Sequence, residues 1–378
     1  MKIKDFKESF KNVKDFRQAH KVKHDLTEML FVAVVATIAN CNTWLEIEAF
    51  AEIKSELLKK YVKLENGIPS HDTFQRVFEQ LDSKAFNKAF MEWTHNLCDN
   101  TEGRIIAIDG KTIRRSFDGE KKAIHIVNAW VDENNLILGQ LKTDSKSNEI
   151  TAIPELLEML FLKESVVTID AMGTQKNIAK KIIQKKGDYV LALKGNQGLF
   201  HKEVIEYMED GLNNDFKDIN ISKKITREKG HGRIEKREYF QTNDIEWFSE
   251  RDKWKGLKSI GMVRRTVTNI KRDTESIELS YYISSLEAPV GAECHLFAKA
   301  IRNHWGIESC HWMLDVVFRE DESLVRKSNG AENLSMLRKI AMNILKTELP
   351  GNKKMSKNMK RFRASMDNTL LEQIIEEI

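Results

Sequence analysis

Two aspartates occupy the same kind of position in the sequence, directly after a short apolar run. Asp109 follows the run in "RIIAIDGKTI", and Asp170 follows the run in "SVVTIDAMGT". Runs of this kind predict buried β-strands, and strand ends in an α/β sheet are where ligands bind. Two carboxylates brought to one sheet edge repel each other unless cations neutralise them. The two aspartates are therefore candidate metal ligands, and a third ligand is expected elsewhere in the chain.

A polar stripe on a predicted helix offers that third ligand. The segment "IRNHWGIESCHWMLDVVF", residues 301–318, places four polar side chains at i, i+4, i+7 and i+11, within about 60° of each other: His304, Glu308, His311 and Asp315. Apolar residues border the stripe on both sides, so we expect it to be buried: Ile307, Leu314 and Phe318 on one side, and Ile301, Trp305, Trp312 and Val316 on the other. Buried carboxylates need a cation or hydrogen bonds to compensate them.

The ligand types indicate the metal and the chemistry. Two Asp and one Glu provide hard oxygen ligands, which suit Mg²⁺ or Mn²⁺ better than zinc. Two such ions about 4 Å apart can activate a water or a 3′-hydroxyl and stabilise the leaving oxygen of a phosphodiester. The sequence therefore predicts an enzyme that acts on a phosphodiester with two Mg²⁺ or Mn²⁺ ions per active site.

A zinc hydrolase is the rival interpretation of the same helix. His304, Glu308 and His311 lie at i, i+4 and i+7, a set that can bind zinc. This interpretation leaves Asp109 and Asp170 unexplained and lacks the HExxH spacing.

The elements that must position these residues predict an α/β protein in several parts. Residues 1–100 have helical periodicity, with Ser70 and Asp72 as candidate caps of a helix that begins near Thr73. Gln75 and Arg76 near its start would suit a helix-turn-helix that reads DNA, but a plain helical bundle is the slightly favoured interpretation.

The order of strands and helices predicts the fold class of the middle of the chain. In residues 101–212, three hairpin-like strands precede alternating helices and strands, which is the order of a ribonuclease H-like mixed sheet with flanking helices. Residues 213–290 predict a β-rich insertion of two long hairpins, turning at 230–232 and near 272–274. Residues 291–350 are helical and carry Glu308, and 351–378 form a basic tail.

The charge distribution indicates a polyanionic partner. The net charge of +4 hides three basic segments: residues 1–24 carry eight Lys or Arg against three acids, 217–272 sixteen against eight, and 352–363 six against none. Nucleic acid is the leading candidate, although any one segment alone is typical of solvated surface. No apolar run reaches the roughly 18 residues of a membrane span, and the N-terminus lacks a secretion signal. We expect a cytoplasmic, nucleoid-associated protein without membrane partners.

Eight stretches together resemble a known family. "AIDGKTIRRS", "TIDAMGTQ", "LALKGNQ", "HGRIEKREY", "YYISSL" and "IRNHWGIESCHWMLDVVFRED" resemble the insertion-sequence DDE transposases of the H-repeat-associated protein group. "KVKHDLTEML" and "NGIPSHDTFQRVFEQLD" resemble the transposase-associated domain of that group, so the resemblance covers nearly the whole chain.

The resemblance implies a function and a site. Asp109, Asp170 and Glu308 would form the catalytic, metal-binding triad on a ribonuclease H-like core, with Mg²⁺ as the physiological ion. The protein would cut and transfer DNA strands, moving an insertion sequence by cut-and-paste transposition. The wider group of related transposases has Tyr, Arg, Glu and Lys at offsets −7, −4, 0 and +7 on the last helix. This chain has Ile301, His304, Glu308 and Asp315 there, so only the Glu agrees and the Arg and Lys roles do not transfer.

Several polar residues near the predicted site are candidate DNA contacts. Contacts to phosphates position DNA without reading its sequence, and each candidate has surface charge or packing as its alternative. They are Lys111 and Arg114 after Asp109, Lys194 and Asn196 at a further strand end, His231 and Arg233 in the first inserted hairpin, and His304 and His311 beside Glu308.

The expected partners follow from the transposase interpretation. They are the ends of the insertion sequence and the target DNA, with no small-molecule substrate. Because two ends must be joined, we expect a homodimer on DNA. A transposase-derived DNA-binding protein without catalysis is the alternative function.

Overall fold

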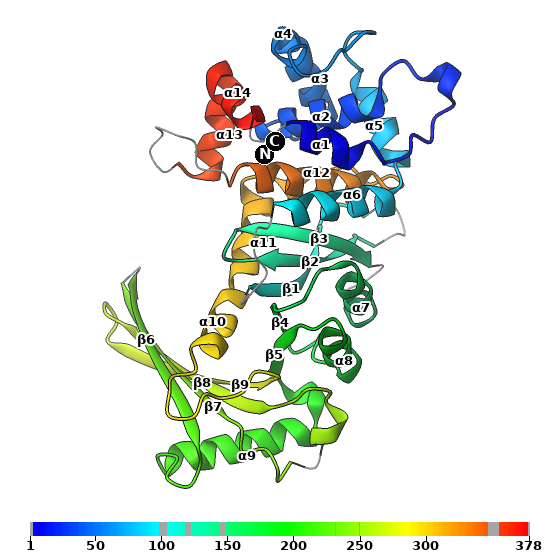
Figure 1. Ribbon diagram of the computed structural model, residues 1–378. Helices are drawn as coiled ribbons and strands as arrows, with labels where there is room; N and C mark the ends of the chain where they lie inside the picture. The colour runs from blue at the N-terminus through cyan, green and yellow to red at the C-terminus, as the bar shows by residue number, and fades with distance from the viewer. Residues whose placement is uncertain are drawn as a thin grey trace. The chain divides into compact units, whose positions relative to one another are not determined.

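The sheet that carries the two predicted strand-end aspartates is mixed and has nine strands. This computed structural model describes the chain except for residues 1–2, 98–103, 118–121, 144–147, 231, 249, 347–354 and 377–378 (Figure 1). The strands are β1 (Ile105–Thr112), β2 (His125–Val131), β3 (Leu136–Thr143), β4 (Val166–Ile169), β5 (Asp188–Leu193), β6 (Ile221–Gly230), β7 (Arg233–Thr242), β8 (Ser259–Asn269) and β9 (Thr274–Ser284). Their order is β3-β2-β1-β4-β5-β9-β8-β7-β6. The predicted α/β class with a mixed sheet is confirmed.

The chain forms two compact units, each assembled from separate stretches of sequence. Unit 1 comprises residues 1–99, 110–148 and 308–378, and unit 2 comprises residues 100–109 and 149–307. One boundary falls within β1, between Asp109 and Gly110. The other falls near the start of helix α11 (Gly306–Val316), between Ile307 and Glu308.

Unit 1 is mainly helical. Its helices, besides most of α11, are α1 (Ile3–Phe10), α2 (Leu26–Ile38), α3 (Trp44–Ile53), α4 (Ser55–Leu58), α5 (His71–Gln80), α6 (Ser83–Asn96), α12 (Gly330–Ile344), α13 (Lys357–Met366) and α14 (Asn368–Glu376). Asp25 and Asp82 cap α2 and α6 through backbone amides, which satisfies donors that a helix start leaves unpaired. Helix α12 is almost entirely buried and packs against α2, α5, α6 and β3.

The N-terminal helices fit a bundle better than a helix-turn-helix. Ser70 caps α5 as the sequence indicates, because its side chain accepts a hydrogen bond from the Thr73 amide. Residues 59–70 separate α4 from α5, a much longer connection than the roughly 3–4-residue turn of a helix-turn-helix. Helices α3 and α5 pack against each other instead.

The basic C-terminal segment is folded rather than a free tail. Arg361 in α13 is fully buried, and its guanidinium donates to the Thr37, Val317 and Asn42 oxygens. It also stacks 4.1 Å from the Phe318 ring centre. The Arg361 side chain therefore stabilises the interior of unit 1.

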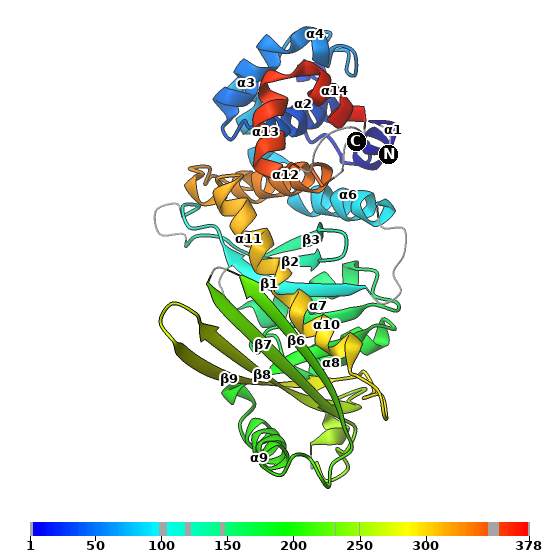
Figure 2. The ribbon, with the colours of Figure 1, turned by 90° about the vertical axis from the view of Figure 1, so that its left-hand side faces the viewer.

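Unit 2 places helices on both faces of its strands. Helix α10 (His295–His304), labelled in Figure 2, packs on β4 and β5. Its Phe297 and Ile301 join a buried cluster with Ile105, Val166 and Val190. Helices α7 (Glu149–Met159) and α8 (Lys176–Gln184) lie on the opposite side from α10 (Figure 1). Helix α9 (Leu199–Asn213) contacts β8 and β9.

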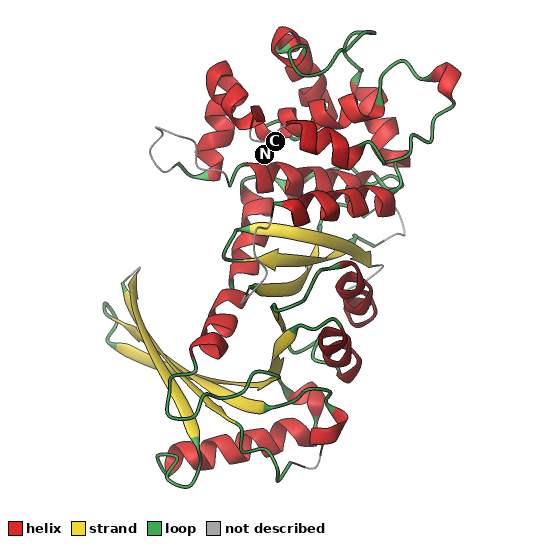
Figure 3. Ribbon diagram, in the orientation of Figure 1, coloured by secondary structure: helices red, strands yellow, loops and turns green. Residues whose placement is uncertain are grey.

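The two inserted hairpins extend the sheet of unit 2. Strands β6 and β7 pair from Ile221 opposite Thr242 to Gly230 opposite Arg233, and β8 pairs with β9 up to Asn269 opposite Thr274. Strand β9 also pairs antiparallel with β5. The four strands therefore form one curved ribbon continuous with β5 (Figure 3).

Short 3₁₀ turns at 19–21, 195–197, 251–253 and 320–322 complete the elements. Among the described residues, no helix combines the length and the apolarity that a membrane span requires.

Candidate active site

Asp109 and Asp170 lie at the same level of the sheet, directly after the paired residues of two neighbouring parallel strands. In unit 2, β1 pairs with β4, and the last paired residues are Ile108 and Ile169. The next residue of each strand is therefore an aspartate, and neighbouring strands lie about 4.8 Å apart. Strand β1 itself continues to Thr112, so Asp109 marks the end of its pairing with β4 rather than the end of the strand. Both side chains are half-buried.

The loop after β4 fixes the orientation of the Asp170 carboxylate. Its Oδ1 accepts hydrogen bonds from the backbone amides of Met172 and Gly173, both at 3.1 Å. Gly173 is required here, since a Cβ at this position would lie 2.3 Å from Ile169 Cγ2 and 2.9 Å from Ile153 Cδ1. The sequence "DAMG" therefore folds the chain back onto its own carboxylate.

Side chains from two loops brace this segment. Thr174 Oγ1 donates to the Ala192 carbonyl of β5 at 2.6 Å. Asn196 Nδ2 donates to the Ala171 carbonyl at 2.7 Å, and Gln197 Nε2 donates to the Thr174 carbonyl at 2.6 Å. Sequence reasoning missed Thr174 and Gln197, whose only signal is a polar residue shortly after a strand end.

Asn196 and Lys194 have different roles although both follow β5. Asn196 Nδ2 donates one hydrogen bond to the Asp170 loop, so Asn196 positions that loop. The residue is exposed, and its phosphate contact stays a prediction. Lys194 is exposed directly after Leu193. Because β5 runs parallel to β4, Lys194 lies at the same edge as Asp170 and remains a candidate phosphate contact.

His304 ends helix α10 against strand β4. Its Nδ1 lies 3.0 Å from Thr168 Oγ1, two residues before Asp170. Burial lowers the pKa of His304 to about 4, although the Asp170 charge acts in the opposite direction. The ring is therefore neutral at neutral pH and anchors the helix end rather than supplying positive charge to a phosphate.

The continuous helix predicted for residues 301–318 is two helices, α10 ending at His304 and α11 beginning at Gly306, and the polar stripe across them is only partly buried. Trp305, Trp312 and Val316 are exposed by 52%, 58% and 55%, so this side of the helix is not buried as expected. The opposite side, Ile307, Leu314 and Phe318, is buried as expected. The helix therefore packs along one side only, and Glu308 is exposed. Glu308 belongs to unit 1, whereas Asp109 and Asp170 belong to unit 2.

His311 and Asp315 serve the interior of unit 1. His311 Nε2 lies 3.3 Å from Asn128 Nδ2. Burial, followed by the charges of Lys111 and Lys339, lowers the pKa of His311 to about 3, so this ring is also neutral at neutral pH. The DNA contact expected of His311 is not favoured by this internal position.

Lys111 lies at the centre of a buried ionic cluster. Its Nζ is 2.6 Å from Asp315 Oδ1, 2.9 Å from Glu320 Oε2 and 3.4 Å from Asp321 Oδ1. Burial alone would raise the pKa of Glu320, but the positive charges of Lys111, Lys339 and Arg338 lower it to about 2. The phosphate contact expected of Lys111 is corrected to an internal role, because its side chain is only 8% exposed and is bonded to carboxylates.

The remaining DNA candidates are on the surface or outside the described residues. The Arg114 side chain is 83% exposed, and its Nε lies 3.3 Å from Asp321 Oδ2. Arg233 is exposed at the start of β7. His231 lies outside the described residues. Arg114 and Arg233 are therefore free to approach a polyanion.

The histidines of the zinc interpretation are engaged separately. His304 bonds to Thr168 in unit 2, and His311 bonds to Asn128 in unit 1. Within the described residues, no three His, Cys, Asp or Glu side chains converge as metal ligands. The two aspartates at one sheet edge do supply the oxygen donors that suit a hard cation such as Mg²⁺.

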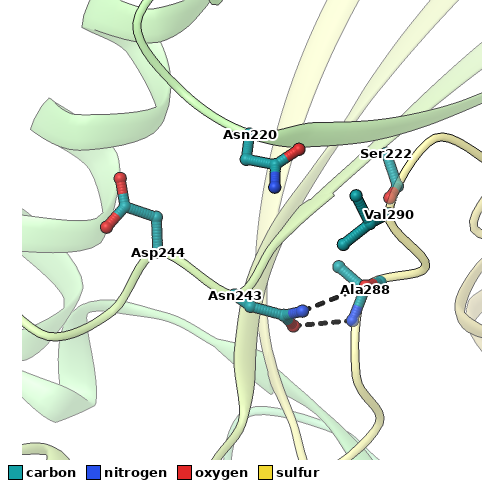
Figure 4. Close-up of a pocket in the computed structure, with 6 residues that line it drawn as sticks. All are labelled: Asn220, Ser222, Asn243, Asp244, Ala288 and Val290. Carbon is teal, nitrogen blue, oxygen red and sulfur yellow. Dashed lines mark hydrogen bonds between the residues drawn. The ribbon is translucent and has the colours of Figure 1, made fainter.

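Unit 2 has a polar pocket of about 230 Å³ whose lining residues hydrogen-bond to one another and to the neighbouring backbone (Figure 4). Asn243 Nδ2 donates to the Ala288 carbonyl at 2.9 Å, and Asn243 Oδ1 accepts from the Ala288 amide at 2.6 Å. Ser222 donates to the Pro289 carbonyl. These hydrogen bonds attach the segment after β9 to β6 and to the residue that follows β7, so we assign the lining residues a structural role.

Comparison with known proteins gives a consistent family match. The family described as "Transposase DDE domain" matches residues 100–344, and the one described as "DDE_Tnp_1-associated" matches residues 7–94. "Putative transposase YncI" of Escherichia coli O157:H7 is 44% identical across 99% of this chain and 95% of its own length. "H repeat-associated putative transposase YhhI" of Escherichia coli K12 is 40% identical across 99% of this chain and 98% of its own.

A solved structure is similar to the chain only at a low level. It is titled "Cryo-EM structure of piggyBac transposase synaptic complex with hairpin DNA (SNHP)". The TM-score is 0.44 at 13% identity, covering 99% of this chain and 79% of the other. At that level the similarity carries no argument about the site.

Proposed function

Because the chain belongs to the family of transposases with a DDE domain, we propose that it cuts and transfers the DNA strands of an insertion sequence. One observation carries the proposal for this chain: the pairing of β1 with β4 ends at Ile108 and Ile169, so Asp109 and Asp170 follow at the same level of the sheet. A pair of like charges at that position is stabilised by cations. We infer that Glu308 completes the triad and that movement is by cut-and-paste transposition.

The strand order supports a ribonuclease H-like core for this activity. Strands β2 and β3 pair antiparallel, and β1, β4 and β5 run parallel in that order. This is the arrangement predicted from three hairpin-like strands followed by alternating helices and strands. The β-rich hairpins enter between α9 and α10, before the helix that begins just ahead of Glu308.

Asp109, Asp170 and Glu308 would hold Mg²⁺ or Mn²⁺, with two ions per active site. Bound ions of this type activate the attacking oxygen and stabilise the leaving oxygen of a phosphodiester. The chain itself orients the Asp170 carboxylate through the Met172 and Gly173 amides. Asn196 and Thr174 hold the same loop against the end of β5.

Exposed basic residues would position the DNA. Lys194 lies at the edge that carries Asp170, and Arg114 follows Asp109 by five residues. Side chains of this kind contact phosphates and fix the register of the duplex. The partners would be the element ends and the target DNA, bound by a homodimer because two ends are joined. We place the protein at the nucleoid for the same reason.

Cleavage of labelled DNA that carries the element's own ends tests this proposal. Wild-type protein should release cut strands with Mg²⁺ or Mn²⁺ and none with a chelator, because the carboxylates need the ions to act. Tight, salt-sensitive binding without a cut product under any divalent ion would contradict catalysis. That outcome would assign the chain the alternative function of a transposase-derived DNA-binding protein.

A further inference from the structure

The four strands β6–β9 have two faces with different charge environments. Because side chains alternate along a strand, the pairing registers sort them into opposite sets. We call one set the Arg237 face; its charged members are Lys224, Glu228, Arg233, Glu235, Arg237, Arg265 and Glu278. We call the other the Arg227 face: Lys223, Ile225, Arg227, Lys229, Ile234, Lys236, Glu238, Arg264, Glu275 and Ile277.

Most basic residues of the Arg237 face are paired with carboxylates within the protein, including Lys224 with Glu293 at 2.9 Å. Arg233, exposed at the turn end of β7, is the exception among the described residues. Arg237 pairs with Glu228 and Glu235, and Arg265 pairs with Glu235 and Glu278. Helix α10 adds Arg302, which lies 3.4 Å from Glu228. Arg237 and Arg265 stand opposite each other in the sheet, but the shared Glu235 carboxylate lies between their charges.

The Arg227 face carries excess positive charge. It has five basic residues, Lys223, Arg227, Lys229, Lys236 and Arg264, against two acids, Glu238 and Glu275. The buried Glu238 already serves three of them: Lys223 at 3.4 Å, Lys236 at 3.1 Å and Arg264. Within the described part of the chain, no ion pair involves Arg227 or Lys229, and both are exposed.

Two like charges face each other directly on this surface. Arg227 stands opposite Lys236 across β6 and β7, and like charges in such a pair destabilise a sheet. Lys236 pairs with Glu238, but this carboxylate is shared with Lys223 and Arg264. An external anion bound between Arg227 and Lys236 would relieve this repulsion. On the Arg237 face, the Glu235 carboxylate does the same between Arg237 and Arg265.

Exposed apolar side chains lie among these charges. Ile225, Ile234 and Ile277 are exposed by 44%, 40% and 61%. Ile225 and Ile234 alternate with basic residues along β6 and β7, and Ile277 lies on the same face of β9. A partner that offers closely spaced anions together with apolar edges suits this surface, and a DNA backbone with its sugars has both.

We propose that the Arg227 face of the β6–β9 ribbon binds the phosphate backbone of DNA. This proposal rests on the proposed function, which makes DNA the partner. It assigns the DNA contact of the basic segment 217–272 to one face of the ribbon. Contacts to phosphates release counterions, so each one contributes about 0.9 to the slope of log affinity against log salt. Arg227 and Lys229 together should contribute close to twice that.

The test measures this slope with a short labelled duplex and a chelator present, so that no cutting occurs. The double variant Arg227→Gln/Lys229→Gln should lower the slope by about 1.8 between roughly 50 and 200 mM salt. The control Lys217→Gln/Lys255→Gln removes the same charge from exposed positions of unit 2 outside the ribbon and should leave the slope unchanged. Thermal melts of both variants verify folding.

The outcomes separate the two proposals. An unchanged slope in the Arg227→Gln/Lys229→Gln protein, with binding retained, would overturn the assignment of this face. If that variant instead sedimented as a smaller species, the face would belong to a second copy of the chain, which also overturns it. Wild type that binds DNA but never cuts would contradict the proposed function, while a lowered slope in the variant would still support the binding face.

Discussion

Lys111 Nζ lies 2.6 Å from Asp315 Oδ1 in the interior of unit 1. Lys111 is the second residue after Asp109, and Asp315 is the seventh after Glu308. The pair therefore links the stretch that follows one proposed metal ligand to the helix that follows another.

Loss of Lys111 should destabilise the fold strongly. In Lys111→Met, the buried Glu320 would lose one of the three cations that neutralise it, and the partly exposed Asp315 would lose its ion pair. Removing one partner of a buried pair costs up to about 3–5 kcal/mol. Arg114→Met is the matched control, because Arg114 is exposed and its pair with Asp321 is worth at most about 1 kcal/mol. Urea unfolding of the two variants measures the difference, and equal losses would contradict the buried-cluster account.

The same cluster predicts an acid dependence of stability. The pKa of Glu320 is lowered from 4.5 to about 2 in the folded protein, which corresponds to about 3 kcal/mol of stability. This contribution is complete above the ordinary pKa and is lost as pH falls from about 4.5 towards 2. The stability gap between wild type and Glu320→Gln should therefore narrow across that range. A gap that stays constant on acidification would refute it.

Gly173 should be intolerant of even a single methyl group. Gly173→Ala would place Cβ against Ile169 and Ile153, and such overpacking costs typically about 1–3 kcal/mol. The displaced loop would also misorient Asp170, so DNA cleavage should fall while DNA binding persists. Gly195→Ala is the control at the neighbouring strand end, because its Cβ would meet open space. Similar behaviour of the two variants would count against the packing argument.

Asn196 and Lys194 should separate positioning from phosphate binding. Asn196→Ala removes the hydrogen bond to the Ala171 carbonyl, so we expect slower cleavage with an unchanged salt slope of DNA binding. Lys194→Ala removes an exposed charge and should lower that slope by about 0.9. If Asn196→Ala lowered the slope as well, Asn196 would have to contact DNA directly.

The sequence predicted the local features of the site and missed the distant partners. The apolar runs before Asp109 and Asp170 are local signals in the sequence. Once β1 and β4 pair in parallel, both aspartates come to the same level of the sheet. Lys111 illustrates the limit, because its partner Glu320 is 209 residues away in sequence. A lysine beside a strand end has the same local sequence whether it meets a phosphate or a buried carboxylate.

Helix and tail burial were hard to predict for the same reason. The apolar residues on both sides of the Glu308 stripe indicated burial on both sides, but Trp305 and Trp312 are exposed. The basic composition of 352–363 predicted a basic tail, yet Arg361 donates to the Thr37 carbonyl near the other end of the chain. Periodicity reports which side of a helix is apolar, whereas tertiary packing decides which side is covered.

The most direct measurement of the central claim compares Asp170→Asn with wild type on labelled element ends with Mg²⁺ or Mn²⁺. The substitution keeps an oxygen that can accept from the Met172 and Gly173 amides, so the loop should persist while the charge that attracts the ion is lost. We predict that cutting disappears, that DNA binding is retained, and that Asp109→Asn and Glu308→Gln behave alike. An Asp170→Asn protein that still cuts at the wild-type rate would contradict the proposed site.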